Sequence, residues 1–495
     1  MSPTPSTAKR SHRPWQGFVV FGTAMLAVFL MGLFFASIME RRREAHHMEV
    51  LQPIAALESD PAKWRANYPR QYDSYLRTRE TEAETKYGGP AFRDYLEETP
   101  ANVILFAGIA FSRDYNQARG HYWARRDTLD TGRLAPDNPG TCWTCKSSDV
   151  PRVMAELGAG LVDDPENASF RERLMAGAAP FYATNFHELT PEMNHTIGCL
   201  NCHDPETMSL RITRPALVEA FERREMDIDE VSHQEMRSLV CAQCHVEYYF
   251  RGENDYLTLP WDQGTTVEDM ERHFDEYEFA DYTHAISGAP IIKIQHPDYE
   301  LYQRGIHAYR SVSCADCHMP YKTEGGVKYS DHHLQSPLLS IDNSCAVCHR
   351  WSETEIRVRV ESIQDKIKEG RERAERALAL AHFDVAAAAQ AGADDAELAR
   401  ARALLRGSQV RWDFVAAAKG MGFHAPQEAQ RILTAAVELA QEARLEAGRL
   451  LAGYGYTAPV AYPAFETKEQ AQALVQRFTN GDPPSLLVGG AGAHP

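Results

Sequence analysis

Ten cysteines form five pairs of the type Cys-x-x-Cys, all between residues 142 and 348. Four pairs are followed directly by a histidine, in the segments CLNCH (199–203), CAQCH (241–245), CADCH (314–318) and CAVCH (345–349). This is the attachment pattern of c-type haem, in which two thioethers hold the porphyrin and the histidine binds the iron. Disulfides and zinc sites also use cysteine pairs, but neither explains a histidine after the second cysteine four times. The four segments therefore predict covalently bound haem.

The fifth pair, CWTCK (142–146), has Lys146 where the other four have histidine. A degenerate site without function is one interpretation. A deprotonated amine is nevertheless a competent iron ligand, and metal binding supplies the driving force for losing the proton. A haem that differs from four similar ones is the one expected to react, because a catalytic iron must keep one position open for substrate.

Five haem motifs with CxxCK first resemble those of the pentahaem cytochrome c nitrite reductases that form ammonia. The resemblance runs from about Glu44 to Leu451 and rests on CWTCKS, HTIGCLNCHD, RSLVCAQCHVEYYF, KIQHPDYELY, VSCADCHMPY, KYSDHH and FHAP. It implies a mainly α-helical multihaem cytochrome, with helices and loops packed around five haem c groups. It also implies six-electron reduction of nitrite to ammonium at a Lys-ligated haem that four bis-His haems supply with electrons. The cysteines bound to haem are then Cys142, Cys145, Cys199, Cys202, Cys241, Cys244, Cys314, Cys317, Cys345 and Cys348.

The resemblance implies a catalytic set in which Lys146 is the proximal ligand and Arg133, Tyr248 and His296 lie on the distal side. Such a site needs cationic groups for the anion and donors for several protons. Tyr248 follows CAQCHVE, and His296 lies in KIQHP. The chain reads DTGRLAP where the family has TLRTG, so Arg133 is assigned by counting without gaps from the segment RGH at 119–121. The rival arginines are Arg113, Arg119, Arg125 and Arg126.

The resemblance further implies axial histidines for the other four haems and a calcium ion beside the catalytic pocket. The proximal ligands are His203, His245, His318 and His349, and the distal ligands are His332, His121, His424 and His307 for the second, third, fourth and fifth haem. His333 is the local rival of His332. The calcium ligands are the carboxylate of Glu247, the main-chain carbonyls of Tyr248 and Lys293, and the side-chain oxygen of Gln295, and all-oxygen ligation suits this ion.

An apolar segment precedes this region, from Gly17 to Met39, and is long enough to cross a membrane as a helix. Basic residues precede it, which predicts a cytoplasmic N-terminus and a periplasmic main body. A cleavable signal peptide is the alternative, but its apolar stretch is usually shorter, and this one runs into the charged segment ERRR (40–43). We expect an uncleaved anchor of the inner membrane formed by residues 17–39, within an N-terminal region 1–43.

Long helices are predicted after the last cysteine pair. Ser352 and Glu355 form a capping box, and apolar residues then recur at helical spacing. Further helices are expected at about 394–419 and 427–451. The expected organisation is a pentahaem catalytic core at 44–350, a long-helix region at 351–480 that forms a dimer interface, and a disordered tail at 481–495. The alternative for the helices is a bundle exposed to solvent.

The chain has 52 basic and 69 acidic residues and a net charge of −17, which argues against nucleic acid as a partner. An anionic substrate then requires a basic pocket inside an acidic shell, and Arg133, Lys293, His296 and calcium are expected to form it. The expected partners are nitrite, a second copy of the chain, and a membrane multihaem quinol dehydrogenase or another cytochrome as electron donor. The alternatives are a non-catalytic electron-transfer cytochrome, or a related reductase acting on hydroxylamine or sulfite.

Overall fold

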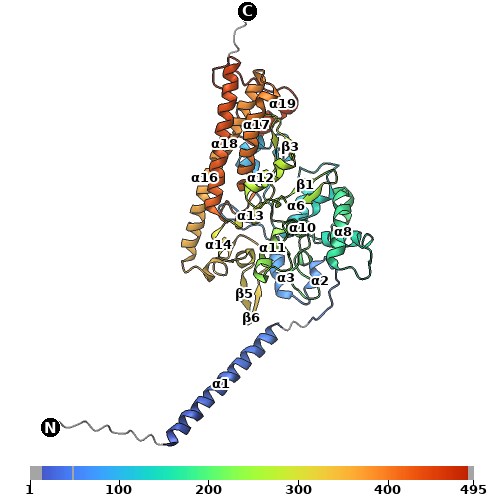
Figure 1. The fold of residues 1–495 in the computed structure, drawn as a ribbon, viewed down its shortest axis with the longest axis vertical. Helices are drawn as coiled ribbons and strands as arrows, with labels where there is room; N and C mark the ends of the chain where they lie inside the picture. Colours follow the sequence, from blue (N-terminus) through green and yellow to red (C-terminus); the bar gives the residue numbers. More distant parts are fainter. Residues whose placement is uncertain (1–13, 47–49, 489–495) are drawn as a thin grey trace, which may run out of the picture. The chain divides into compact units, whose positions relative to one another are not determined.

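The computed structural model describes residues 14–46 and 50–488, and the chain divides into two compact units, residues 1–53 and 54–495. The first unit contains helix α1 (Pro14–His46), drawn in dark blue in Figure 1. Its segment Trp15–Met39 has a mean hydropathy of 2.4 and none of it is buried. By length and composition this helix is able to cross a membrane, as a signal sequence also would be. The basic residues of the expected cytoplasmic N-terminus lie outside the described residues.

The second unit is mainly helical, which confirms the expected fold class. Its α-helices are α2 (Pro61–Trp64), α3 (Pro69–Leu76), α4 (Tyr95–Glu98), α5 (Ala101–Leu105), α6 (Ala124–Asp130), α7 (Val150–Ala159), α8 (Phe170–Ala183), α9 (Phe186–Leu189), α10 (Pro215–Arg223), α11 (His233–Ala242), α12 (Val267–Glu276), α13 (Asp298–Tyr302), α14 (Ile306–Tyr309), α15 (Cys314–His318), α16 (Glu353–Gln390), α17 (Asp395–Ala417), α18 (Pro426–Gly453) and α19 (Lys468–Thr479). The strands form antiparallel pairs: β1 (Tyr249–Arg251) with β2 (Tyr256–Thr258), β3 (Tyr282–Thr283) with β4 (Pro290–Ile291), and β5 (Tyr321–Glu324) with β6 (Val327–Ser330).

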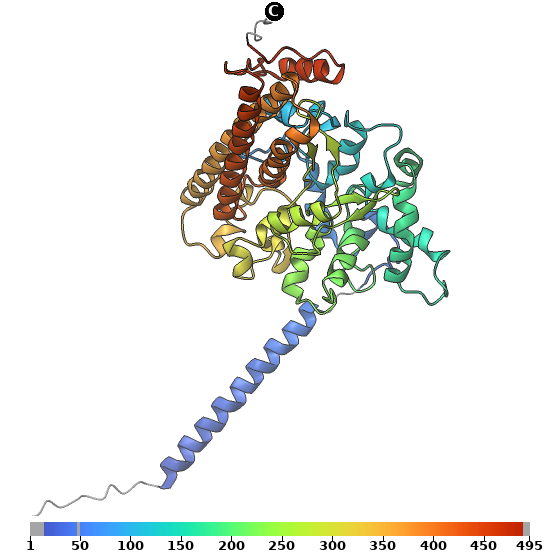
Figure 2. The same cartoon turned by 45° about the horizontal axis from the view of Figure 1, so that its top comes forward.

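The three long helices begin where the sequence provides caps. Capping boxes start α16, with Ser352 and Glu355, and α17, with Asp394 and Glu397, while α18 begins with a proline. A seam of small residues on α16, including Ala374, Ala377 and Ala381, is buried. Small side chains let helices approach closely, and α16, α17 and α18 lie side by side (Figure 1, Figure 2).

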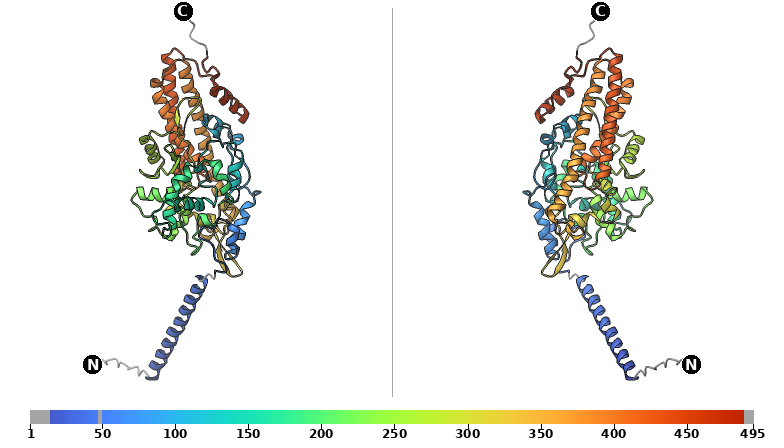
Figure 3. Two further views of the ribbon diagram at one scale, coloured as in Figure 1. Left: turned by 90° about the vertical axis from the view of Figure 1, so that its right-hand side faces the viewer. Right: turned by 90° about the vertical axis from the view of Figure 1, so that its left-hand side faces the viewer.

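These helices belong to the same compact unit as the cysteine pairs. Helix α16 contacts α5, and α17 contacts β4 and α12. Both side views show the three long helices along the shorter helices and turns of residues 60–350 (Figure 3). The long helices therefore support the wall of the region that carries the chemistry.

Two features near the C-terminus differ from the sequence-based expectation. Helix α19 packs on α5 and was not predicted. Leu486, in the tail expected to be disordered, is buried, and its backbone bonds to Gln390 and Ala461 at 2.9 Å each. The reason is that one apolar side chain finds a place in the core beside α16. Residues 489–495 of the tail lie outside the described residues.

Candidate active site

All ten cysteines line one large cavity in the second unit. The cavity has a volume of about 2370 Å³, which is several times the ~300–1,000 Å³ of an ordinary ligand pocket. The cysteines, all within the described residues, form no disulfide bonds. The cavity therefore has the size and the thiols for several large covalently attached groups.

Each histidine motif is wound into a helical turn that aims three side chains at the cavity. The backbone N–H of His203 bonds to the carbonyl of Cys199 at 3.0 Å, and His245 and His349 make the same bond to Cys241 and Cys345 at 2.9 Å. Positions i, i+3 and i+4 lie on one side of such a turn. Both cysteines and the histidine of each motif therefore face the same space.

Four pairs of histidine rings face each other across the cavity. The ring centroids are 6.2 Å apart for His203 and His332, 6.5 Å for His245 and His121, 6.4 Å for His318 and His424, and 6.3 Å for His349 and His307. Two imidazoles bound to one metal ion by bonds of about 2 Å each have their centroids roughly 6 Å apart. The four separations have the size that a shared iron requires, and the partners are those expected from the sequence.

Hydrogen bonds at Nδ1 orient several of these rings. Nδ1 lies 2.9 Å from the carbonyl oxygen of Met208 in His203, and 3.0 Å from that of Gln335 in His318. In His245 it lies 3.1 Å from Oδ2 of Asp298. An acceptor at Nδ1 assigns the proton to that nitrogen and leaves the Nε2 lone pair free for a metal ion. Burial also lowers the pKa of His203 and His318 to about 4, so these rings are neutral near pH 7.

The local rival His333 does not take part in a ring pair. His332 faces His203, whereas the backbone N–H of His333 donates to Oδ1 of Asp331 at 3.0 Å. The pattern of facing rings thus distinguishes two adjacent histidines that the sequence alone leaves ambiguous.

The first cysteine pair has different neighbours. Lys146 lines the cavity together with Cys142, Cys145, Tyr248 and His296. Burial lowers the pKa of His296 well below its ordinary value, and the nearby ammonium of Lys146 lowers it further. Burial raises the pKa of Tyr248 well above its ordinary value, with Cys145 and Cys142 as further causes. The structure thus brings Lys146, Tyr248 and His296 into one part of the cavity.

Two of the five candidate arginines, Arg119 and Arg133, line the cavity, and only Arg133 shares an aromatic contact with Lys293 among the described residues. Its guanidinium lies 4.6 Å from the centroid of the Phe111 ring and donates to the carbonyl of Asp114 at 3.1 Å. The Phe111 ring also contacts the ammonium of Lys293, at 5.0 Å, and Lys293 is three residues before His296. Arg133 therefore lies near the segment that carries His296.

The rival arginines are bound elsewhere. Arg119 pairs with Asp127 and stacks on Trp123, and Arg126 pairs with Asp130 on the exposed side of α6. Arg125 donates to the carbonyl of Met193, and Arg113 is exposed.

The predicted calcium ligands converge on one loop. Oε2 of Glu247 accepts from the backbone N–H of Gln295 at 2.6 Å, while Oε1 is buried and has no hydrogen-bond partner among the described residues. The side-chain amide of Gln295 lies 3.0 Å from the carbonyl oxygen of Lys293 and can present its oxygen there by a half-turn. A buried carboxylate oxygen without a donor beside a carbonyl and an amide fits an oxygen-liganded cation.

The side chain of Lys293 corrects one expectation. Its ammonium is buried, lies 2.9 Å from Oδ2 of Asp413 on α17, and sits over the rings of Phe106 and Phe111. Because the carboxylate of Asp413 neutralises it, this ammonium does not contribute to a basic path for an anion. The expectation that Lys293 helps to form the basic pocket is therefore wrong.

Known proteins resemble the chain over almost its whole length. The family model for cytochrome c552 matches residues 60–482. The chain belongs to the cytochrome c552 family. Cytochrome c-552 of Porphyromonas gingivalis is 48% identical over 477 residues, covering 94% of this chain and 92% of that protein. Cytochrome c-552 of Parabacteroides distasonis is 49% identical over 472 residues, with the same coverage. The resemblance found in the sequence is thereby confirmed, and haem c is the cofactor that a cytochrome of this family implies.

The fold also resembles a solved structure of related sequence. The catalytic subunit of cytochrome c nitrite reductase from Desulfovibrio desulfuricans, whose structure is described as having two calcium sites, superposes with a TM-score of 0.73. It is 31% identical to this chain, and the match covers 80% of this chain and 88% of that one.

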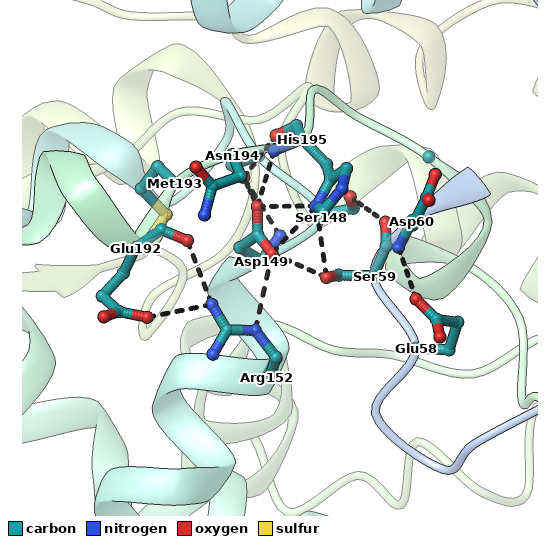
Figure 4. Close-up of polar contacts among 12 residues, drawn as sticks. Glu58, Ser59, Asp60, Ser148, Asp149, Arg152, Glu192, Met193, Asn194 and His195 are labelled. Carbon is teal, nitrogen blue, oxygen red and sulfur yellow. Dashed lines mark hydrogen bonds and ion pairs between the residues drawn. The ribbon is translucent and has the colours of Figure 1, made fainter. Parts of the chain in front are cut away.

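In this cytochrome c552 chain, the segment after Lys146 is fixed by a cluster that sequence reasoning missed (Figure 4). The buried carboxylate of Asp149 accepts from the hydroxyl of Ser59 at 2.6 Å and from the backbone N–H of His195 at 2.7 Å. The hydroxyl of Ser148 donates to the carbonyl of Ser59 at 2.6 Å. The ring of His195 meets both Asp149 and Ser59 through Nδ1, so it does not bridge them as a hydrolase triad does. The cluster positions the Lys146 segment against residues far away in the chain.

Two further residues near the cavity were also missed. Asp298, two residues after His296, holds the ring of His245, and Lys419 at the end of α17 lies on the cavity wall. The only local signal for Lys419 is a single charge in the otherwise apolar run VAAAKGMGF (415–423).

Proposed function

We propose that this chain reduces nitrite to ammonium, at a haem attached to Cys142 and Cys145 with Lys146 as its proximal ligand. The overall reaction consumes nitrite, six electrons and eight protons and yields ammonium and two water molecules. Five haem c groups, one at each cysteine pair, would supply the redox chemistry. The similarity to the nitrite reductase of Desulfovibrio desulfuricans supports this substrate.

A contrast among the five motifs carries the proposal. Four motif histidines face a second histidine at 6.2–6.5 Å, the arrangement of an electron carrier with two strong ligands. Lys146 shares its part of the cavity with Tyr248 and His296. A purely electron-carrying cytochrome has no use for this different set, whereas a catalytic site needs donors beside an open position.

The roles of the surrounding side chains follow from their chemistry. The guanidinium of Arg133 provides paired donors and a positive charge for a planar anion. His296 and Tyr248 each carry a proton that can be donated to an oxygen or nitrogen atom within hydrogen-bond reach. A calcium ion held by Glu247, Gln295 and the carbonyls of Tyr248 and Lys293 would order the loop that carries His296 and add positive potential.

The proposal includes a location and partners. We propose that α1 anchors the chain in the inner membrane, with the main body on the periplasmic side, and that a membrane multihaem quinol dehydrogenase supplies electrons. We also propose a homodimer. Three exposed apolar residues lie in the sequence within or just after the fifth cysteine pair: Val347 (71%), Trp351 (54%) and Val358 (60%). Large apolar side chains exposed together indicate an interaction surface. Size measurement in detergent at micromolar concentration should give a dimer, and a monomer alone would contradict this part.

The test uses the purified full-length protein reduced by a viologen dye. We expect it to consume nitrite and to release one ammonium per nitrite. The spectrum should contain a high-spin haem signal beside low-spin ones. The variant Lys146→Met should keep the low-spin signals and lose the nitrite reduction. Oxidation of the haems without ammonium would instead indicate an electron-transfer cytochrome.

A further inference from the structure

Four aromatic rings form a continuous platform between the start of α4 and the loop after α5. Tyr115 contacts Tyr95 and Phe111 with ring centroids 5.2 Å apart and Phe106 at 5.7 Å, and Phe106 contacts Phe111 at 5.8 Å. The faces of aromatic rings carry partial negative charge and attract cations. This aromatic platform, defined by Tyr95, Phe106, Phe111 and Tyr115, is therefore suited to hold positive side chains in place.

Three cationic side chains lie on the aromatic platform. Lys293 lies over Phe106 at 4.9 Å, Arg133 over Phe111 at 4.6 Å and Lys419 over Tyr95 at 5.4 Å. The charge of Lys293 is already neutralised by Asp413. All three residues line the cavity. Arg133 and Lys419 are therefore the two cations on the platform whose charge Asp413 does not neutralise.

The environment of Lys419 keeps its side chain charged. Its backbone N–H donates to Oδ1 of Asp298, whose Oδ2 binds the ring of His245. Burial lowers the pKa of Lys419, but Tyr95, Tyr115 and Asp298 outweigh this effect and raise it above its ordinary value. Both carboxylate oxygens of Asp298 accept from donors other than the Lys419 ammonium, which instead interacts with Tyr95 of the platform.

We propose that Lys419 is a second anion-binding residue of the catalytic pocket, which the aromatic platform holds beside Arg133 to attract and bind nitrite. This inference rests on the proposed function. In it, Lys419 takes the place of Lys293 as the lysine that gives the pocket its positive charge. A charge fixed in a partly enclosed cavity raises the local concentration of an anion and speeds its arrival, and salt screens this effect.

The test compares an anionic with a neutral substrate. The variant Lys419→Met keeps the length of the side chain and removes its charge. We expect the nitrite KM to rise about tenfold with kcat nearly unchanged, and the dependence of kcat/KM on salt to weaken. Hydroxylamine carries no charge at neutral pH, so its KM should stay within twofold of the unaltered protein. Lys419→Arg should restore most of the affinity for nitrite. The matched control is Lys63→Met, at a lysine whose side chain is 65% exposed.

A direct binding measurement adds a readout besides turnover. Nitrite titrated into the oxidised protein and followed in the haem spectrum should bind about tenfold more weakly to Lys419→Met. If nitrite and hydroxylamine were affected equally, Lys419 would act by supporting the fold, and the inference would fail. If the nitrite KM were unchanged and the reduction potential of a haem shifted, the Lys419 ammonium would bind a haem carboxylate and not the substrate. That result would also overturn the inference. If the unaltered protein reduced no nitrite, the proposed function itself would be wrong.

Discussion

Arg133 differs from the neighbouring arginines in what holds it. Its guanidinium rests on Phe111 and a carbonyl group. Within the described part of the chain it has no carboxylate partner as tight as that of Arg126, which lies 2.5 Å from Asp130. A guanidinium without a tight anionic partner retains its capacity to bind a substrate anion.

We therefore expect Arg133→Ala to raise the nitrite KM and lower kcat. Loss of a charge-assisted hydrogen bond costs ~1.5–3 kcal/mol, which is roughly a 10–100-fold drop in kcat/KM. Arg126→Ala is the matched control from the same segment, and steady-state kinetics with nitrite should show it unchanged. Equal effects of the two substitutions would remove Arg133 from the site.

Asp149 fixes the segment after Lys146 through charge as well as shape. Burial alone raises the pKa of this carboxyl, but hydrogen bonds from Ser59 and His195 reverse that effect and leave the pKa below its ordinary value. A depressed pKa in the folded state means that the carboxylate stabilises the fold above the ordinary pKa of about 4. This contribution is lost as the pH falls through the folded-state pKa.

The variant Asp149→Asn should accordingly lower the free energy of unfolding by about 1–3 kcal/mol at pH 7. The difference from the unaltered protein should shrink as the pH drops below about 4. Denaturant unfolding at the two pH values measures both quantities. A difference that stays constant with pH would show that the charge of Asp149 is unimportant.

The residues that the sequence predicts and those that it misses differ in how far along the sequence their contacts reach. The motif histidines follow from a five-residue pattern, because a single helical turn arranges them. Lys419 and Asp413 act on residues more than a hundred positions away, and no local pattern records which charge will meet which ring. The neutralisation of Lys293 by Asp413 is the clearest case, since the sequence alone made Lys293 a free cation.

At the scale of elements, helix α17 determines where the loop of His296 lies. Asp413 on this helix accepts from the ammonium of Lys293 at 2.9 Å and from the backbone N–H of Ile294 at 3.0 Å. The same loop carries two of the four predicted calcium ligands, Lys293 and Gln295, and His296 follows directly. Helix α17 thus acts as a support for the loop of His296, which has no regular structure of its own.

Breaking this link should be costly. Asp413→Asn leaves the Lys293 ammonium buried without a counter-charge, and such a change typically costs ~3–5 kcal/mol. The double variant Lys293→Met with Asp413→Asn should recover part of the loss, because no unpaired charge remains. Unfolding free energies of the single and double variants test this coupling. If the double variant were less stable than the single variant Asp413→Asn, the charge argument would be wrong.

The long helices were predictable because caps and spacing lie within one segment. Ser352 with Glu355 marks the start of α16, and the helical spacing of the apolar residues that follow predicts that the helix continues. Helix α19 also begins with a capping box, Thr467 with Gln470, but its apolar face is short and its partner α5 is distant in the sequence. The position of α19 in the fold depends on tertiary contacts that no local sequence pattern indicates.

At the scale of the whole molecule, the large cavity decides how the fold is held together. The cavity walls come from residues 64 to 424, and side chains do not fill the space between them. Covalent haem would supply the missing apolar core, since each porphyrin would bury a large area against these walls. The cytochrome would therefore be expected to fold only as haem is attached, on the side of the membrane where attachment occurs.

The intact mass of the protein purified in detergent tests this arrangement in one measurement. If α1 is retained as an anchor and each cysteine pair binds one haem, as we propose, the mass should be that of the full 495-residue chain, allowing for removal of the first methionine, plus five haem groups. A mass lower by the first 40 or so residues would show that α1 is a cleaved signal. A mass with four haems would mean that the CWTCK motif is degenerate, and Lys146 could not then be the ligand of a catalytic haem. Peptide mapping of the Cys142–Lys146 segment would decide between loss of that haem and loss of another, so each outcome assigns a single cause.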